Sequence, residues 1–141
     1  MDDKGVCKAL GMDDPSRGYV LLNSMVFFWP TRERLRTMIR ARANKGMCHD
    51  LLVVDTAKLV ESHCDNIRLS PMNSGATKPV AHPRRLDLFK RLEDFPFDDR
   101  LRSHQRAKAV AEVCVVGGIR DIGDVVVDIR TAVMVNDLID F

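Results

Sequence analysis

The segment AVAEVCVVGG, residues 109–118, combines an apolar run typical of a buried β-strand with a single carboxylate. Alternate side chains of a strand share a face, so Glu112 points the same way as Val110 and Cys114. A carboxylate is costly to bury unless it is paired, hydrogen-bonded or neutral. The sequence therefore predicts a structural ion pair, an exposed sheet edge or a functional group at Glu112.

The rest of the chain mixes short strand and helix patterns. Pro30 ends the apolar run MVFFWP, and Thr31 is placed to cap a helix that Gly46 stops. Asp55 or Thr56 caps another helix after DLLVVD. We expect strands at 25–30, 50–55, 66–70, 109–116 and 121–130, and helices at 18–24, 32–44, 57–63, 86–92 and 98–106. Because the two kinds of element do not alternate regularly, the sequence predicts an α+β fold.

At 141 residues the chain is long enough for one hydrophobic core and too short for two. We therefore expect a single domain over residues 1–141, with a weakly patterned segment at 1–24 and a C-terminal tail at 131–141. Residues 71–85, PMNSGATKPVAHPRR, predict a long loop. Loops of that length in compact domains are often functional or mobile.

Charge and cysteine content restrict the classes of partner and location. The 22 basic and 20 acidic residues give a net charge of +2, so nucleic-acid binding would need a local basic patch. No apolar run approaches the roughly 18 residues that span a bilayer, and the N-terminus lacks a signal-peptide pattern. The four cysteines form no CxxC pair. We expect reduced thiols, a cytoplasmic location and no membrane partner.

Two adjacent cysteine–histidine pairs, Cys48-His49 and His63-Cys64, raise the question of a zinc site. Structural zinc ligands are normally two to four residues apart, because immediate neighbours point to opposite sides of an element. The sequence therefore predicts no metal. Cys114 is a poor candidate nucleophile as well, because a carboxylate on the same face raises the pKa of its thiol.

The helix predicted at 32–44 carries the strongest local positive charge. At 100° per residue, Arg32, Arg36 and Arg40 form one stripe, separate from an apolar stripe. The apolar stripe consists of Leu35, Met38 and Ile39, and Arg42 falls inside it. Two interpretations stay open: a solvated face on which Arg42 snorkels or bonds terminal carbonyls, or a surface that binds phosphates.

Four segments, MVFFWPTRERL, HDLLVVDTAKL, IRLSPMNSGAT and RAKAVAEVCVVGGIRDIGDVVVDI, resemble an uncharacterised bacterial domain family over most of residues 17–130. That family is distantly similar to the DarT-type ADP-ribosyltransferases. The likeness to the enzymes rests on a basic-rich approach, an Ala-Glu pair, apolar residues, a short turn and a closing strand. It implies an ADP-ribosyltransferase-like fold, a split, mostly antiparallel β core with a cleft between its halves and helices around it.

The resemblance also implies an activity and its residues. NAD would be the substrate, and Glu112 would be the catalytic carboxylate that stabilises positive charge on the ribose. Arg106 matches an active-site arginine six residues before that glutamate. The remaining candidates are Phe28, Trp29 and Arg32 for the NAD pocket, and Arg36 and Arg40 for an acceptor phosphate. Core packing is the alternative for the two aromatic residues.

Two departures from the enzyme pattern keep other functions open. No histidine precedes His49, although such enzymes begin with a strand whose histidine contacts NAD. Two interpretations stay open: the sequence is truncated before that strand, or the domain has lost this first strand and its contact with the cofactor. No Gln-x-Glu or Glu-x-Glu pattern precedes Val113, which favours nucleic acid or a small molecule as acceptor. The alternative is a non-enzymatic regulatory module that binds nucleic acid or a partner protein. An exposed sheet edge would favour a homodimer.

Overall fold

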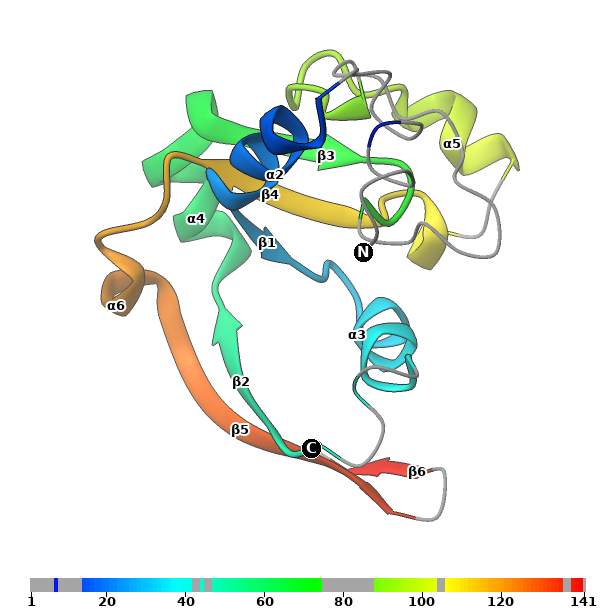
Figure 1. Cartoon of the computed structure of the whole chain (residues 1–141), viewed down its shortest axis with the longest axis vertical. Helices are drawn as coiled ribbons and strands as arrows, with labels where there is room; N and C mark the ends of the chain where they lie inside the picture. Colours follow the sequence, from blue (N-terminus) through cyan, green and yellow to red (C-terminus); the bar gives the residue numbers. More distant parts are fainter. Residues whose placement is uncertain are drawn as a thin grey trace.

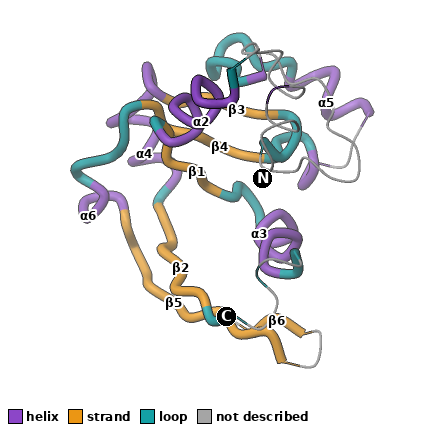
Figure 2. The backbone as a smooth tube through the Cα atoms, in the orientation of Figure 1, coloured by secondary structure: helices purple, strands orange, loops and turns teal. Residues whose placement is uncertain are grey.

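The computed structural model describes residues 7, 14–41, 44, 47–74, 88–103, 106–135 and 138–140. It confirms an α+β chain with small antiparallel sheets and several helices (Figures 1 and 2). The helices are α2 (Pro15–Asn23), α3 (Arg32–Ile39), α4 (Thr56–His63), α5 (Phe97–Ser103) and α6 (Ile122–Val125), with 3-10 turns η1 (Cys64–Asn66) and η3 (Arg106–Lys108). The strands are β1 (Met25–Phe28), β2 (His49–Val54), β3 (Ile67–Ser70), β4 (Glu112–Val116), β5 (Val126–Val135) and β6 (Leu138–Asp140).

The first sheet has the order β1-β4-β3, with β4 in the centre and both pairings antiparallel. Directly opposed residues share a face, so one face carries Val115 beside Ile67. Both side chains belong to the main hydrophobic core, which also contains Leu59 of α4. The other face carries Glu112 and Cys114, which lie opposite residues of β3 and β1. The core therefore covers one face of this sheet and leaves Glu112 on the other.

The second sheet has the order β2-β5-β6, and β5 is long enough to pair with both neighbours. Figure 1 shows β2 and β5 running away from the first sheet as a curved ribbon, with α3 on its concave side. The pairing register shifts between Val53 and Val54, which marks a β-bulge. The backbone N–H of Asp55 donates to the Val125 carbonyl (2.8 Å) and joins the ribbon to the body of the molecule.

The helix starts follow the predicted capping residues. The Thr31 side chain accepts from the Arg34 N–H, and the Asp55 side chain accepts from the N–H groups at the start of α4. These bonds satisfy N–H groups that have no partner inside the helix. Helix α3 ends at Ile39 and not near Asn44, because the Asn44 side-chain amide donates to the Met38 carbonyl (2.8 Å) and closes the last turn. The predicted stop at Gly46 lies outside the described residues.

Three other sequence predictions differ from the structure. Residues 121–130 are not one strand, because α6 occupies the first part and β5 begins only at Val126. The segment from residue 88 does not form the predicted helix, since Lys90 pairs with Leu69 through backbone bonds of 2.7 and 3.0 Å. Strand β4 begins at Glu112, so Val110 falls outside the alternation and packs against the core. Most of the predicted loop at 71–85 lies outside the described residues.

Candidate functional site

A cleft of about 510 Å³ lies between the first sheet and the β2–β5 ribbon. One wall consists of β1, the connection after it and the start of α3, and the other consists of β2, Arg130 of β5 and Ile122 of α6. The predicted NAD-pocket residues Phe28, Trp29 and Arg32 all line this cleft. Apolar residues Phe27, Leu51 and Val53 complete much of its surface.

The local sequence explains how the first wall forms. Pro30 follows Trp29 and ends the extended run, and Thr31 then starts α3 as its N-cap. The turn thus places Phe28 at the end of β1, Trp29 after it and Arg32 at the start of α3 in the lining of one cleft. Phe28 also packs against the main hydrophobic core, so core packing accounts for part of its environment. Trp29 remains 36% exposed, which leaves its indole accessible. This wall offers ring faces and a positive charge to a ligand.

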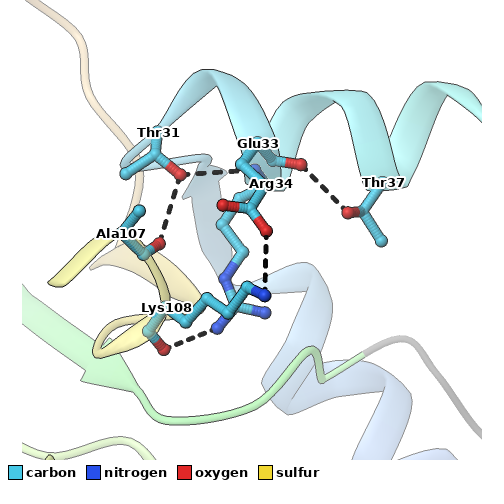
Figure 3. A network of polar contacts seen from close by, with 6 residues as sticks. All are labelled: Thr31, Glu33, Arg34, Thr37, Ala107 and Lys108. Carbon is cyan, nitrogen blue, oxygen red and sulfur yellow. Dashed lines mark hydrogen bonds and ion pairs between the residues drawn. The ribbon is translucent and has the colours of Figure 1, made fainter. Parts of the chain in front are cut away.

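A polar network attaches α3 to η3 (Figure 3). The Thr31 hydroxyl donates to the Ala107 carbonyl (3.4 Å), and Arg34 Nη2 donates to the Lys108 carbonyl (2.6 Å). Lys108 Nζ forms an ion pair with Glu33 Oε1 at 3.3 Å. Since η3 leads into β4, these bonds position the cleft wall relative to the strand that carries Glu112. Arg34 therefore makes structural contacts, unlike the exposed arginines Arg32, Arg36 and Arg40.

Glu112 is only 5% exposed, and its Oε2 accepts a hydrogen bond from the Ser74 backbone N–H at 2.9 Å. Ser70 lies directly across the sheet from Glu112, and its hydroxyl bonds the Met72 carbonyl. The turn after β3 therefore folds over the carboxylate. Glu112 does not belong to the residues that line the cleft described above. Of the possibilities at this position, an exposed sheet edge is wrong, because the side chain is buried.

Arg100 is a residue that the sequence did not single out. Its Nε donates to the Ala109 carbonyl (3.1 Å) and its Nη2 to the Pro71 carbonyl (2.9 Å). One guanidinium thus joins the segment before β4 to the segment after β3, on either side of the Glu112–Ser74 bond. No local pattern indicates this role, because both acceptors are backbone carbonyls, which every residue has.

The predicted arginines take different positions. Arg106 lies in η3 and is exposed, and its carbonyl accepts from the Ala109 N–H at 3.3 Å. Arg32, Arg36 and Arg40 are exposed along α3, as the predicted stripe requires, while Ile39 is fully buried. Arg42, which the sequence placed inside the apolar stripe, lies outside the described residues.

The cysteines and histidines lie in different environments: Cys48 and Cys64 are exposed, Cys114 is buried, and His49 Nε2 is buried with no hydrogen-bond partner among the described residues. Burial, with a smaller contribution from the nearby Glu112 charge, raises the pKa of the Cys114 thiol far above its ordinary value. His63 Nε2 lies 2.9 Å from Asp121 Oδ1, whereas Cys64 beside it is exposed. Over the described part of the chain, no three His, Cys, Asp or Glu side chains gather closely enough to hold a metal.

The structure thus defines an α+β protein with a partly aromatic cleft and a buried glutamate on the adjoining sheet. The chain belongs to the family of unknown function DUF7002, which matches residues 1–126. No curated protein and no solved structure matches the chain. Among the described residues, no helix combines the length and apolar character needed to cross a membrane.

Proposed function

We propose that this protein is an ADP-ribosyltransferase-like domain that binds NAD in the cleft between β1–α3 and the β2–β5 ribbon. The observation that carries the proposal is the grouping of Phe28, Trp29 and Arg32 on one wall of a single cleft. Aromatic rings stack on a nicotinamide or adenine ring, and a guanidinium binds phosphate oxygens through paired hydrogen bonds. The volume of about 510 Å³ is within the range of small-molecule sites.

The proposed reaction uses Glu112 as its carboxylate. The bond between nicotinamide and ribose C1′ breaks, nicotinamide leaves with the bonding electron pair, and the ribose becomes oxocarbenium-like. A nucleophile on nucleic acid or a small molecule then attacks C1′ and loses its proton to a base. A fixed carboxylate stabilises the developing positive charge and accepts that proton.

Glu112 is on the strand next to β1, two residues from Cys114, which lies opposite the cleft residue Phe27. It therefore shares a sheet face with Phe27, whereas Phe28, which lies opposite Val113, is on the other face. For transfer, the ribose must reach past Phe27, and the turn at Ser74 must move away from the carboxylate that it covers. NAD binding and turnover can therefore be measured separately, because NAD binds in the cleft whether or not the turn at Ser74 opens.

The test measures NAD binding by calorimetry and nicotinamide release by chromatography, with single-stranded DNA or RNA present. We expect Trp29→Ala to weaken NAD binding about tenfold, since ring stacking contributes about 1–3 kcal/mol per base. Phe97→Ala is the matched control, because Phe97 is comparably exposed (41%) and does not line the cleft. Glu112→Gln should keep NAD binding and lower the rate of release by at least about 100-fold. Equal binding by wild type and Trp29→Ala contradicts the assignment of the cleft, and equal release by Glu112→Gln contradicts the catalytic role.

A second candidate is a non-enzymatic module that binds nucleic acid through α3. The exposure of Arg36 and Arg40 on one side of this helix favours it. This function predicts that affinity for single-stranded RNA or DNA falls steeply with salt and that each of the two arginine-to-alanine changes reduces the salt dependence. Arg102→Ala, an exposed arginine of α5, is the control. Binding that ignores salt, or that depends on Glu112, contradicts this candidate.

A further inference from the structure

The ribbon side of the cleft contributes a second guanidinium, which the sequence did not identify. Arg130 of β5 lies opposite Leu51 of β2, and both residues line the cleft. Directly paired residues project from the same sheet face, so Arg130 projects on the cleft side with Leu51. Arg32 lines the other wall. The cleft therefore has a guanidinium on each of two walls, and its lining also includes the carboxylate of Asp50, which accepts a hydrogen bond from the Thr131 hydroxyl at 3.1 Å. Most of the other lining residues are apolar or aromatic.

Asp128 forms an ion pair with Arg130 through the Nε edge of the guanidinium. Asp128 Oδ2 accepts from Arg130 Nε at 2.7 Å, and Asp128 Oδ1 accepts from the Ile129 N–H at 2.9 Å. Residues two apart on a strand share a face, which places the carboxylate beside the guanidinium stem. Among the described residues, Arg130 makes its side-chain hydrogen bond through Nε alone. Both terminal nitrogens thus remain as a pair of donors for an anion.

Stability does not account for this pair. Both side chains are well exposed, at 40% for Arg130 and 46% for Asp128. Exposed ion pairs contribute little to folding because water screens the charges. By contrast, an arginine whose Nε already bonds a carboxylate loses less side-chain entropy when it binds a phosphate. Preorganisation of this kind increases the affinity for the phosphate.

We propose that Arg130 is an anion-binding residue of the cleft and that Asp128 is its positioning residue. Together with Arg32, Arg130 selects ligands in which phosphate groups adjoin an aromatic base, and it disfavours the uncharged nucleoside. This inference rests on the proposed function in treating the cleft as the ligand site, and it adds a second phosphate-binding residue and the residue that positions it. Both residues lie beyond residue 126, where the family match ends.

The experiment compares the affinities of wild type and variants for NAD, ADP and adenosine by calorimetry. Arg130→Ala should weaken NAD and ADP binding about tenfold or more, as expected for a charged hydrogen bond, and should change adenosine binding less than about twofold. Arg130→Lys should recover only part of the loss, because lysine keeps the charge without the paired donors. Arg91→Ala and Glu93→Gln, from an exposed ion pair outside the cleft, are the matched controls and should leave all three affinities unchanged.

The variant Asp128→Asn tests whether Asp128 acts by positioning Arg130 or only through its negative charge. Removal of a negative charge next to Arg130 should by itself strengthen anion binding, whereas loss of the positioning ion pair should weaken it. We expect ADP affinity to fall about threefold, with adenosine unaffected. An increase in ADP affinity overturns the positioning role of Asp128.

The remaining outcomes separate the two proposals. Wild-type NAD binding that Arg130→Ala leaves unchanged, or an equal loss for adenosine, overturns the role of Arg130 but leaves the cleft assignment in place. Failure of the wild type to bind any of the three ligands overturns the proposed function and this inference with it. Circular dichroism of each variant verifies that the fold is retained.

Discussion

Replacement of Glu112 separates its structural contribution from its proposed chemistry. The side chain is 5% exposed and accepts the Ser74 N–H at 2.9 Å. A hydrogen bond to a charged group contributes about 1.5–3 kcal/mol, and an unsatisfied buried donor carries a cost of similar size. Since Ser74 is itself only 9% exposed, water cannot easily replace the lost acceptor. We expect Glu112→Ala to lower the free energy of unfolding by about 2–3 kcal/mol.

Glu112→Gln should behave differently. The glutamine side chain has nearly the same shape and keeps a carbonyl oxygen for the Ser74 N–H, but the bond loses its charge-assisted component. We expect a loss of about 1 kcal/mol, the range of a neutral hydrogen bond. The difference between the two variants therefore measures the contribution of the acceptor itself.

Urea unfolding followed by circular dichroism gives both free energies, and hydrogen exchange reports the Ser74 amide directly. The amide should exchange faster in Glu112→Ala and stay protected in Glu112→Gln. Glu61→Ala is the control, because Glu61 is an exposed residue of α4, and its effect should stay within about 0.5 kcal/mol. A Glu112→Ala protein as stable as wild type, or one with unchanged Ser74 exchange, refutes the view that this carboxylate holds the turn.

Three further predictions concern other parts of the molecule. Because burial raises the pKa of its thiol, Cys114 should resist thiol reagents in the native protein, whereas exposed Cys64 reacts within the first phase of a colorimetric thiol assay. Gly118 has φ +88°, and a Cβ added there would have open space around it. Gly118→Ala should therefore lower the free energy of unfolding in urea by about 1 kcal/mol through backbone strain alone. Gly123→Ala is the control, because Gly123 does not have a positive φ. The hydrogen bond from its arginine partner lowers the pKa of Asp128, so this group favours the folded state above about pH 4 and loses that effect as the pH falls through its folded pKa. A carboxyl NMR titration should show that lowered pKa in wild type and a higher pKa in Arg130→Ala, in which only the backbone hydrogen bond from Ile129 still lowers it.

Much of the local structure was predictable. Thr31 and Asp55 cap helices as expected, because capping depends only on a side chain and the two or three N–H groups after it. The separation of Glu112 and Cys114 from Val115 follows from strand alternation. Sequence neighbours around a single turn also stay neighbours in space, so Phe28, Trp29 and Arg32 reach one cleft. Boundaries were less accurate, as at the end of α3, where the Asn44 side chain reaches back to Met38.

Contacts between distant segments were decided by the tertiary structure alone. The sequence left an ion pair, an exposed edge or a functional group open at Glu112, and did not show that a backbone N–H 38 residues earlier donates to it. It also contained no indication that Arg100 bonds two separate backbone carbonyls, or that Arg130 faces the cleft across from Arg32. The physical reason is that capping and alternation depend on atoms a few residues apart. Which strand lies beside which depends instead on how the whole chain buries its apolar faces, and this arrangement gives the cleft its second wall.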